Sequence, residues 1–228
     1  MTTVPGPESR CLDAISGLYG IIDPAAPGSP DPRALCLALL GAGVRIVQLR
    51  MKDASDAEHL ALVPALLGPC QAHGASLIIN DRLQVAASCK GLGLHLGQED
   101  IDPRQARQAL GPSALIGLST SSPAEALAAQ QLPIDYIGFG PIYSSSGKHL
   151  SPNDRRSPRA AVGLSALKEV VQKARVPVVA IGGIELQHLP DLKQTGVHAV
   201  AVISAISSSA SYKETAMAFQ QGLDAKLE

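Results

Sequence analysis

Residues 76–120 read SLIINDRLQVAASCKGLGLHLGQEDIDPRQARQALGPSALIGLST, and short apolar runs alternate in them with segments of helical composition. The apolar runs Ser76–Asp81, Gly93–Gly97 and Leu115–Thr120 have the length of strands that are buried on both faces. The two segments between them are too long for hairpin turns and are rich in Ala, Leu and Gln. Strands that alternate with helices predict parallel βαβ units.

The same alternation continues on both sides of this stretch and reaches the C-terminus. The predicted strands are Leu18–Ile22, Arg45–Arg50, Ser76–Asp81, Gly93–Gly97, Leu115–Thr120, Tyr136–Gly140, Pro177–Gly183 and Ala199–Ser204. The predicted helices are Asp31–Leu40, Ser55–His73, Leu83–Cys89, Pro103–Leu110, Pro123–Gln130, Leu164–Ala174, His188–Gln194 and one near Ala210–Leu227. This alternation predicts one α/β domain, a (β/α)8 TIM barrel over residues 17–228, after a flexible extension over residues 1–16. An open parallel sheet is the alternative.

Composition restricts the class of partner. Apolar residues make up 46% of the chain, charged residues 17%, and the formal net charge is −1, which argues against nucleic-acid or membrane-surface binding. No run approaches the roughly 18 apolar residues that cross a membrane, and the N-terminus lacks the apolar run of a signal peptide, so we expect a cytoplasmic protein. The four cysteines form no CxxC pair and the six histidines no HExxH motif, so no zinc site is predicted. The sequence leaves open whether the chain forms a homo-oligomer.

Polar residues gather where the second predicted strand ends. Period-2 alternation places Gln48, Arg50 and Lys52 on one face, with Leu49 and Met51 on the other. In a barrel, the carboxyl ends of the strands carry the chemistry. The three donors are therefore expected to point into the barrel mouth, although a solvated strand end with rim salt bridges would have the same composition.

Two carboxylates follow the next two predicted strands. Asn80 and Asp81 follow Leu77–Ile79, and Asp100 follows His95–Glu99. A helix N-cap would explain either aspartate alone. Together, beside cations, they fit better as oxygen ligands for a Mg²⁺ ion shared with a phosphorylated substrate.

The remaining strand ends carry hydroxyl groups and glycines. Ser119 lies at the end of the fifth strand, and the sixth strand leads into Ser144–Lys148, where Ser145, Ser146, Gly147 and Lys148 can meet an anion. A plain surface loop has a similar composition. After the last two strands, Gly182–Gly183 and Ile203–Ser204 stand where barrels often bind a phosphate on backbone N–H groups. A tight turn is the alternative for the glycines.

Seven motifs in order resemble the thiamine phosphate synthase family, and they span about residues 18 to 206. They are QLRMK (48–52), IIND (78–81), HLGQED (95–100), IGLS (116–119), FGPIY (139–143), AIGGI (180–184) and VISAI (202–206). The resemblance implies a (β/α)8 barrel that joins 4-amino-2-methyl-5-(diphosphooxymethyl)pyrimidine to 4-methyl-5-(2-phosphooxyethyl)thiazole. The products would be thiamine phosphate and diphosphate.

The resemblance also implies residue roles. The segment Gln48–Lys52, Leu49 and Met51 included, would bind the pyrimidine diphosphate with Asn80, Ser119 and Lys148, and Asp81 and Asp100 would hold Mg²⁺. The thiazole phosphate would lie on Gly183, Ile203, Ser204 and the loop Ser145–Gly147. Arg50, Lys52 and Lys148 would be catalytic, because with Mg²⁺ they offset the charge of the leaving diphosphate. The thiazole nitrogen carries no proton that must be removed, so no histidine base is expected.

This chain departs from the family pattern in one loop. Where the family reads Pro-Thr-x-Thr-Lys, the chain reads Ser144-Ser145-Ser146-Gly147-Lys148, and the loop that follows is longer. Two other functions are weighed against the synthase. A related thiazole tautomerase would have a histidine where Pro141 stands, and a non-catalytic barrel would bind the precursors without consuming them.

Overall fold

The computed structural model describes residues 15–26, 28–144 and 160–225. Within them, eight parallel strands close into a barrel in sequence order, β1 to β8, and β8 pairs with β1. The strands are β1 (Gly17–Ile22), β2 (Ile46–Leu49), β3 (Ser76–Asn80), β4 (Leu92–Leu96), β5 (Ile116–Thr120), β6 (Tyr136–Phe139), β7 (Val178–Ile181) and β8 (Ala199–Val202). The predicted barrel is therefore confirmed, and the open sheet is wrong.

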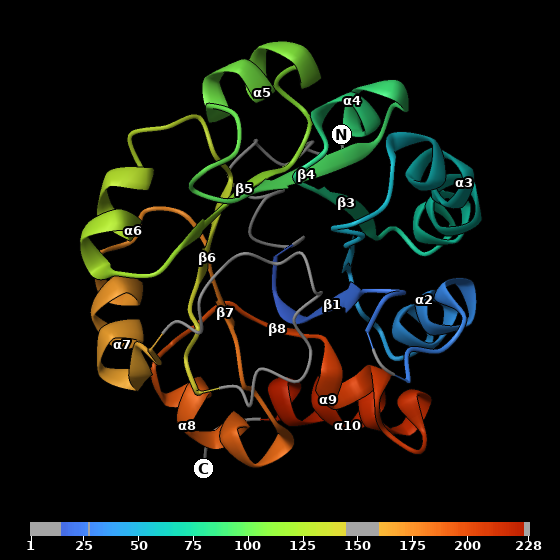
Figure 1. Cartoon of the computed structure of the whole chain (residues 1–228). Coiled ribbons are helices and arrows are strands. Elements are labelled where there is room, and N and C mark those ends of the chain that lie inside the picture. Colours follow the sequence, from blue (N-terminus) through green and yellow to red (C-terminus); the bar gives the residue numbers. More distant parts are fainter. Residues whose placement is uncertain (1–14, 27, 145–159, 226–228) are drawn as a thin grey trace, which may run out of the picture.

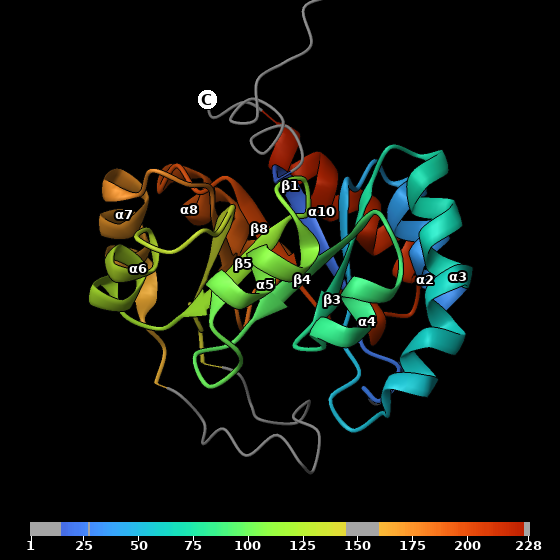
Figure 2. The same cartoon turned by 90° about the horizontal axis from the view of Figure 1, so that it is seen from above.

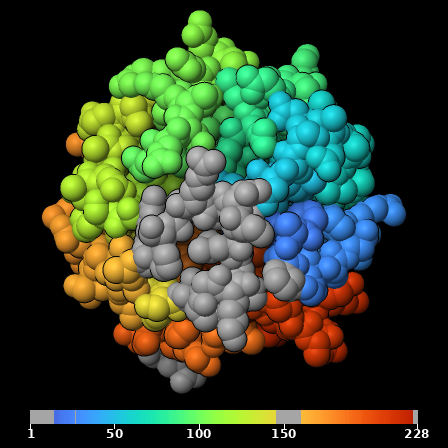
Figure 3. Space-filling view, in the orientation of Figure 1, coloured from blue at the N-terminus to red at the C-terminus, as the bar shows by residue number. Residues whose placement is uncertain are grey.

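The helices lie outside the strands in both views (Figures 1 and 2). They are α2 (Pro32–Gly41), α3 (Asp56–Ala72), α4 (Leu83–Ser88), α5 (Pro103–Leu110), α6 (Pro123–Ala129), α7 (Gly163–Lys173), the 3-10 turn η1 (Leu186–His188), α8 (Leu189–Gln194), α9 (Ser204–Ser207) and α10 (Tyr212–Asp224). Successive units follow one another around the barrel, as the order of colours shows in Figure 3. No described helix has the length and apolar character that a membrane crossing requires.

Local sequence explains where several helices begin. Ser55 caps α3 and forms a reciprocal capping box with Glu58. Asp102 and Ser122 accept backbone N–H groups at the starts of α5 and α6, each before a proline that suits the first turn. Two short elements were not predicted. The turn η1 precedes the helix that was expected to begin at His188, and α9 follows β8 where the last strand was expected to continue to Ser204.

The core has two layers because side chains alternate along each strand. In β2, Ile46 belongs to an inner cluster inside the barrel, while Val47 and Leu49 belong to the outer layer between strands and helices. Within residues 1–16, predicted as an extension, only Ile15 and Ser16 are described, and Ile15 is buried in the inner cluster. The extent of that extension stays a prediction.

Candidate active site at the mouth of the barrel

The mouth, defined here as the edge of the barrel where the strands have their carboxyl ends, holds buried charge. Gln48, Arg50 and Asn80 are 3%, 7% and 8% exposed. Arg50 forms an ion pair with Asp23, which follows β1 and is itself 4% exposed. A buried carboxylate beside a guanidinium fixes the position of that cation and compensates its desolvation. Sequence analysis missed Asp23, although its place directly after an apolar strand was a usable signal.

Lys52 and two carboxyl groups meet at the ends of β3 and β4. Lys52 Nζ forms an ion pair with Asp81 Oδ2, and the Asp81 and Asp100 carboxyls lie close enough to interact. The backbone N–H of Gly97 donates to Asp100 Oδ2 at 2.6 Å. The structure therefore brings together the two aspartates that the sequence placed at neighbouring strand ends. The metal role of this pair stays a prediction.

The two carboxyls have opposite pKa shifts. Burial acts to raise the pKa of Asp81, but hydrogen bonds from Asp100 and Lys52 outweigh it, and the net direction is down. Burial and the hydrogen bond to Asp81 raise the pKa of Asp100. Opposite shifts of this kind are expected when two carboxyls converge, because the charge of one disfavours ionisation of the other.

Asp81 has an unusual backbone. Its φ is +63°, the left-handed region that few residues other than glycine adopt. Its N–H donates to the carbonyl of His95 at 2.9 Å, and the next N–H, of Arg82, donates to the carbonyl of Asn80 at 2.8 Å. These two bonds turn the chain sharply at the end of β3 and leave the Asp81 side chain beside Lys52. Strained backbone of this kind concentrates at functional sites.

A chain of hydrogen bonds crosses the interior of the barrel just below the mouth. Gln48 Nε2 donates to Tyr19 Oη at 2.8 Å, and Tyr19 Oη lies 2.8 Å from Tyr136 Oη. Tyr136 Oη lies 3.0 Å from His95 Nδ1, and His95 Nε2 lies 2.8 Å from Ser119 Oγ. Two predicted substrate residues, Gln48 on β2 and Ser119 on β5, are thus linked through three residues that sequence analysis missed.

The two phenols of this chain stay protonated. Burial raises the pKa of both tyrosines, so each keeps its proton at neutral pH. A phenol can donate one hydrogen bond and accept another, and the donor and acceptor roles of the two His95 ring nitrogens depend on the tautomer. The linked side chains therefore hold one another in place between Gln48 and Ser119.

Glycines make room for these rings. Register places His95 beside Gly117, and Gly117 beside Tyr136. A Cβ on Gly117 would overlap the Tyr136 ring and lie 2.6 Å from His95 Nδ1, and one on Gly138 would lie 3.1 Å from His95 Cε1. The missed residues therefore had a signal: polar rings at inward positions, with glycine at the same level of the neighbouring strand.

The side of the mouth formed by β7 and β8 is built from backbone. Gly182 and Gly183 have φ of +99° and +65°, and Ser204 begins α9 directly after Ile203. Leu49, also predicted to bind substrate, has its side chain fully buried in the outer layer, while Met51 packs partly buried against that layer. The predicted residues Ser145, Ser146, Gly147 and Lys148 lie outside the described residues.

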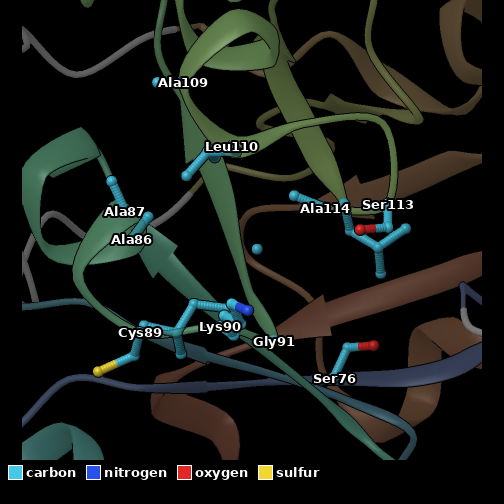
Figure 4. A pocket seen from close by; sticks show the side chains of 13 residues that line it. Ser76, Ala86, Ala87, Cys89, Lys90, Gly91, Ala109, Leu110, Ser113 and Ala114 are labelled. Atoms are coloured by element: carbon cyan, nitrogen blue, oxygen red, sulfur yellow. The ribbon is translucent and has the colours of Figure 1, made fainter.

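A hollow of about 580 Å³ lies at the opposite edge of the barrel (Figure 4). Lys90, Ser76 and Ser113 are among its lining residues. Ser76 is the first residue of β3, whereas Asn80 at the other end of the same strand lies at the mouth. The hollow is therefore separate from the site described above.

Comparisons with known proteins agree with this geometry. A family model described as thiamine monophosphate synthase matches residues 18–206. The thiamine-phosphate synthase of Chlorobium phaeobacteroides is 38% identical over 180 residues, 79% of this chain and 84% of that protein. The enzyme of the same name from Persephonella marina is 34% identical over 197 residues, 86% of this chain and 90% of that protein.

A solved structure extends the likeness to the fold. The thiamine phosphate pyrophosphorylase of Pyrococcus furiosus superposes with a TM-score of 0.80 at 27% identity, covering 93% of this chain and 98% of that one. On the family match and the two relatives, which cover most of its length, the chain belongs to the thiamine monophosphate synthase family.

Proposed function

We propose that the mouth of this barrel joins 4-amino-2-methyl-5-(diphosphooxymethyl)pyrimidine to 4-methyl-5-(2-phosphooxyethyl)thiazole. The products are thiamine phosphate and diphosphate. The observation that carries the proposal is the pairing, in a chain of this family, of a charged side-chain site at β2–β4 with a backbone site at β7–β8. One site suits a diphosphate and the other a single phosphate.

Two cations that follow β2 hold the diphosphate. A guanidinium carries five N–H donors in a fixed plane, a geometry that suits the oxygens of a diphosphate. The ion pair with Asp23 holds the Arg50 guanidinium in place. Lys52 adds a second positive charge, and Asn80 adds an amide that is 8% exposed. Lys148 is proposed as a third cation from the sequence alone.

The Asp81–Asp100 pair fits Mg²⁺. The two carboxyls lie close enough to shift each other's pKa, and hard carboxylate oxygens are the ligands that this ion takes in ones or twos. Within the described residues no group of three or more His, Cys, Asp or Glu gathers, so water and diphosphate oxygens would complete the shell. Bound there, the ion would supply Lewis-acid stabilisation of the charge on the leaving oxygens.

The polar chain inside the barrel positions the pyrimidine. Gln48 and Ser119 end that chain, and each has a fixed hydrogen-bond partner below it. A heteroaromatic ring with an amino group and ring nitrogens needs both donors and acceptors at fixed positions. The linked side chains provide them with little freedom to reorient.

The thiazole phosphate lies on the other side, on Gly183, Ile203 and Ser204. Gly182 and Gly183 both have positive φ, and turns with such backbone can direct N–H groups toward an anion. The loop Ser145–Gly147 is proposed to complete this site. Its single glycine in place of a threonine removes one hydroxyl donor.

The reaction requires stabilisation of the negative charge on the departing diphosphate and alignment of the two rings. The bond between the CH₂ carbon and the diphosphate oxygen breaks as the aminopyrimidine ring donates electrons. The thiazole nitrogen then forms the new C–N bond. Arg50 and Lys52 stabilise the departing charge, and the Gly183 side holds the nucleophile in place. No described side chain has to remove a proton from the thiazole.

The test is incubation of the purified chain with both precursors and MgCl₂, followed by mass analysis. Thiamine phosphate and diphosphate in equal amounts are expected. An isomerised thiazole without coupling would identify a tautomerase, although Pro141 stands where that enzyme has a histidine. Precursors bound but unconsumed would identify a non-catalytic barrel. A cytoplasmic location and the state of assembly stay predictions.

A further inference from the structure

The segment Pro141–Tyr143, which follows β6, forms backbone hydrogen bonds with the end of β7, with the Gly182–Gly183 turn and with the residues before α7. Ile142 N–H donates to the Ile181 carbonyl at 2.9 Å, and Tyr143 N–H donates to the Gly182 carbonyl at 3.0 Å. Where the chain returns to α7, Val162 N–H donates to the Pro141 carbonyl at 2.8 Å. The Gly182–Gly183 turn and both described ends of the preceding loop therefore meet at Pro141–Tyr143.

The glycine turn lies directly on this segment. A Cβ on Gly182 would lie 2.5 Å from Pro141 Cβ, and a Cβ on Gly183 would lie 2.7 Å from the Tyr143 carbonyl oxygen. Real Cβ atoms do not approach other atoms so closely. The position of the Gly183 N–H is therefore set by where Tyr143 sits.

Tyr143 is held by an aromatic stack. Its ring lies against the His188 ring with centroids 3.9 Å apart and planes at 16°. His188 is fixed in turn, because Glu185 N–H donates to His188 Nδ1 at 3.0 Å and His188 N–H donates to the Glu185 carbonyl at 3.0 Å. His188 ends η1, which follows the glycine turn, so the stack joins Tyr143 to the segment that leads out of that turn.

The contact of Tyr143 is made by its ring and not by its hydroxyl. The hydroxyl oxygen is buried and has no hydrogen-bond partner among the described residues. A buried hydroxyl without a partner lowers stability. A residue kept for hydrogen bonding would have one, so we assign the function to the stacked ring.

We propose that Tyr143 and His188 are a pair of positioning residues that fix the Gly182–Gly183 turn for the phosphate of the thiazole substrate. This inference rests on the proposed function, which places that phosphate at Gly183. Neither ring has to touch the substrate. The pair acts on binding of the nucleophile and leaves departure of the diphosphate unaffected.

The experiment compares Tyr143→Phe and Tyr143→Leu in steady-state kinetics of the full chain, with each substrate varied in turn. Tyr143→Leu removes the stack and should raise KM for the thiazole about three- to tenfold, the range that an aromatic pair contributes. KM for the pyrimidine should stay unchanged. Tyr143→Phe keeps the ring and should restore the wild-type KM.

His188 supplies an independent check and Tyr212 a matched control. His188→Leu should raise the same KM, and the double variant should show no further rise, because both changes remove one interaction. Tyr212→Leu makes the same chemical change at a half-buried position on α10 and should alter neither KM. An unchanged thiazole KM in Tyr143→Leu, or an equal rise in both KM values, would overturn the inference.

Calorimetric titration of the thiazole phosphate into wild type and variants separates this inference from the proposed function. A wild type that binds the thiazole and forms no thiamine phosphate would contradict the proposed function, and the ratio of Kd values would then decide the role of the stack. Weaker binding in Tyr143→Leu and His188→Leu supports the inference, and equal binding rejects it. A wild type that binds no thiazole would reject both.

Discussion

The two sides of the mouth are built from different parts of the chain. At β1–β4 the site consists of side chains, with Arg50 and Lys52 each paired to an aspartate. At β7 it consists of backbone, with glycines at positive φ packed against Pro141 and Tyr143. On the first side, changing one functional group removes a charge. On the second side, adding one carbon atom disturbs the backbone geometry. We therefore expect substitutions on the charged side to lower kcat/KM and substitutions on the backbone side to raise KM for the thiazole.

The largest effect is expected from Asp81→Asn, which tests the charged side. Asparagine tolerates the left-handed backbone of Asp81 and keeps its size, so the change removes charge without adding strain. We expect kcat/KM to fall by about 10³-fold, the upper end for loss of one preorganised electrostatic group. Activity measured against MgCl₂ concentration should also lose its saturation.

The matched control is Asp102→Asn, which changes an exposed helix cap near the same rim. Asparagine caps as well as aspartate, so activity should be preserved. Full magnesium-dependent activity in Asp81→Asn would contradict the assignment of this carboxylate.

Arg50→Ala is expected to cost about 2–4 kcal/mol of transition-state stabilisation in kcat/KM, as one preorganised donor does. It also leaves Asp23 buried without its partner, so melting temperature must be measured beside the kinetics. Arg50→Lys keeps the charge and loses the planar donor set, and it should fall between alanine and wild type.

Arg82→Ala is the control for Arg50. Arg82 pairs with Asp56 at 3.2 Å and is about one-third exposed, so little activity should be lost. Similar kcat/KM values for the Arg50 and Arg82 variants would contradict the catalytic role of Arg50.

Gly183→Ala tests the backbone side. Position 183 has a φ of +65°, and the new Cβ would meet the Tyr143 carbonyl. We expect about a tenfold higher KM for the thiazole, which corresponds to about 1.4 kcal/mol. KM for the pyrimidine should change little.

Gly111→Ala separates backbone strain from contact. Gly111 has a φ of +79° with nothing within 4 Å of its Cβ position, so it carries the strain without the collision. It lies at the end of α5, and its kinetics should match those of wild type while its stability falls. Equal KM values in the two variants would show that the Gly183 turn does not hold the substrate.

The same contrast explains what the sequence could predict. Period-2 alternation placed Gln48 and Arg50 on the inner face correctly, because a strand has only two faces. Alternation of strands and helices predicted the barrel. The meeting of Asp81 with Asp100 was expected because neighbouring parallel strands end at one edge, but the position of the Asp100 carboxylate also depends on the bond it accepts from the Gly97 N–H.

Contacts between side chains far apart in the sequence depend on closure of the barrel, and no local sequence pattern predicts them. Tyr19 and Tyr136 stand 117 positions apart and meet only because β1 and β6 both face one interior. The stack of Tyr143 on His188 joins a loop after β6 to a turn after β7. The four-residue helix α9 was missed because such a length gives no periodic signal.

The smallest effect is expected from Tyr136→Phe. This change removes the hydroxyl in the middle of the series of hydrogen bonds that runs from Gln48 to Ser119 inside the barrel. This hydroxyl links Tyr19 to His95, so the change removes one hydrogen bond from each of these residues and should cost about 1 kcal/mol of stability. KM for the pyrimidine should rise slightly, while KM for the thiazole should not change. A larger effect on the thiazole would contradict the division of the mouth.

The pH dependence of stability sharpens this last test. Burial raises the pKa of Tyr19 and Tyr136, so the folded chain disfavours ionised phenols that form freely in the unfolded chain near pH 10. Their contribution is therefore fully present below about pH 10 and is lost as pH rises further. The melting temperature of wild type should fall above that pH, and Tyr136→Phe should weaken the fall because one ionisable phenol is gone. Parallel curves for the two proteins between pH 9 and 11 would show that this phenol does not resist ionisation.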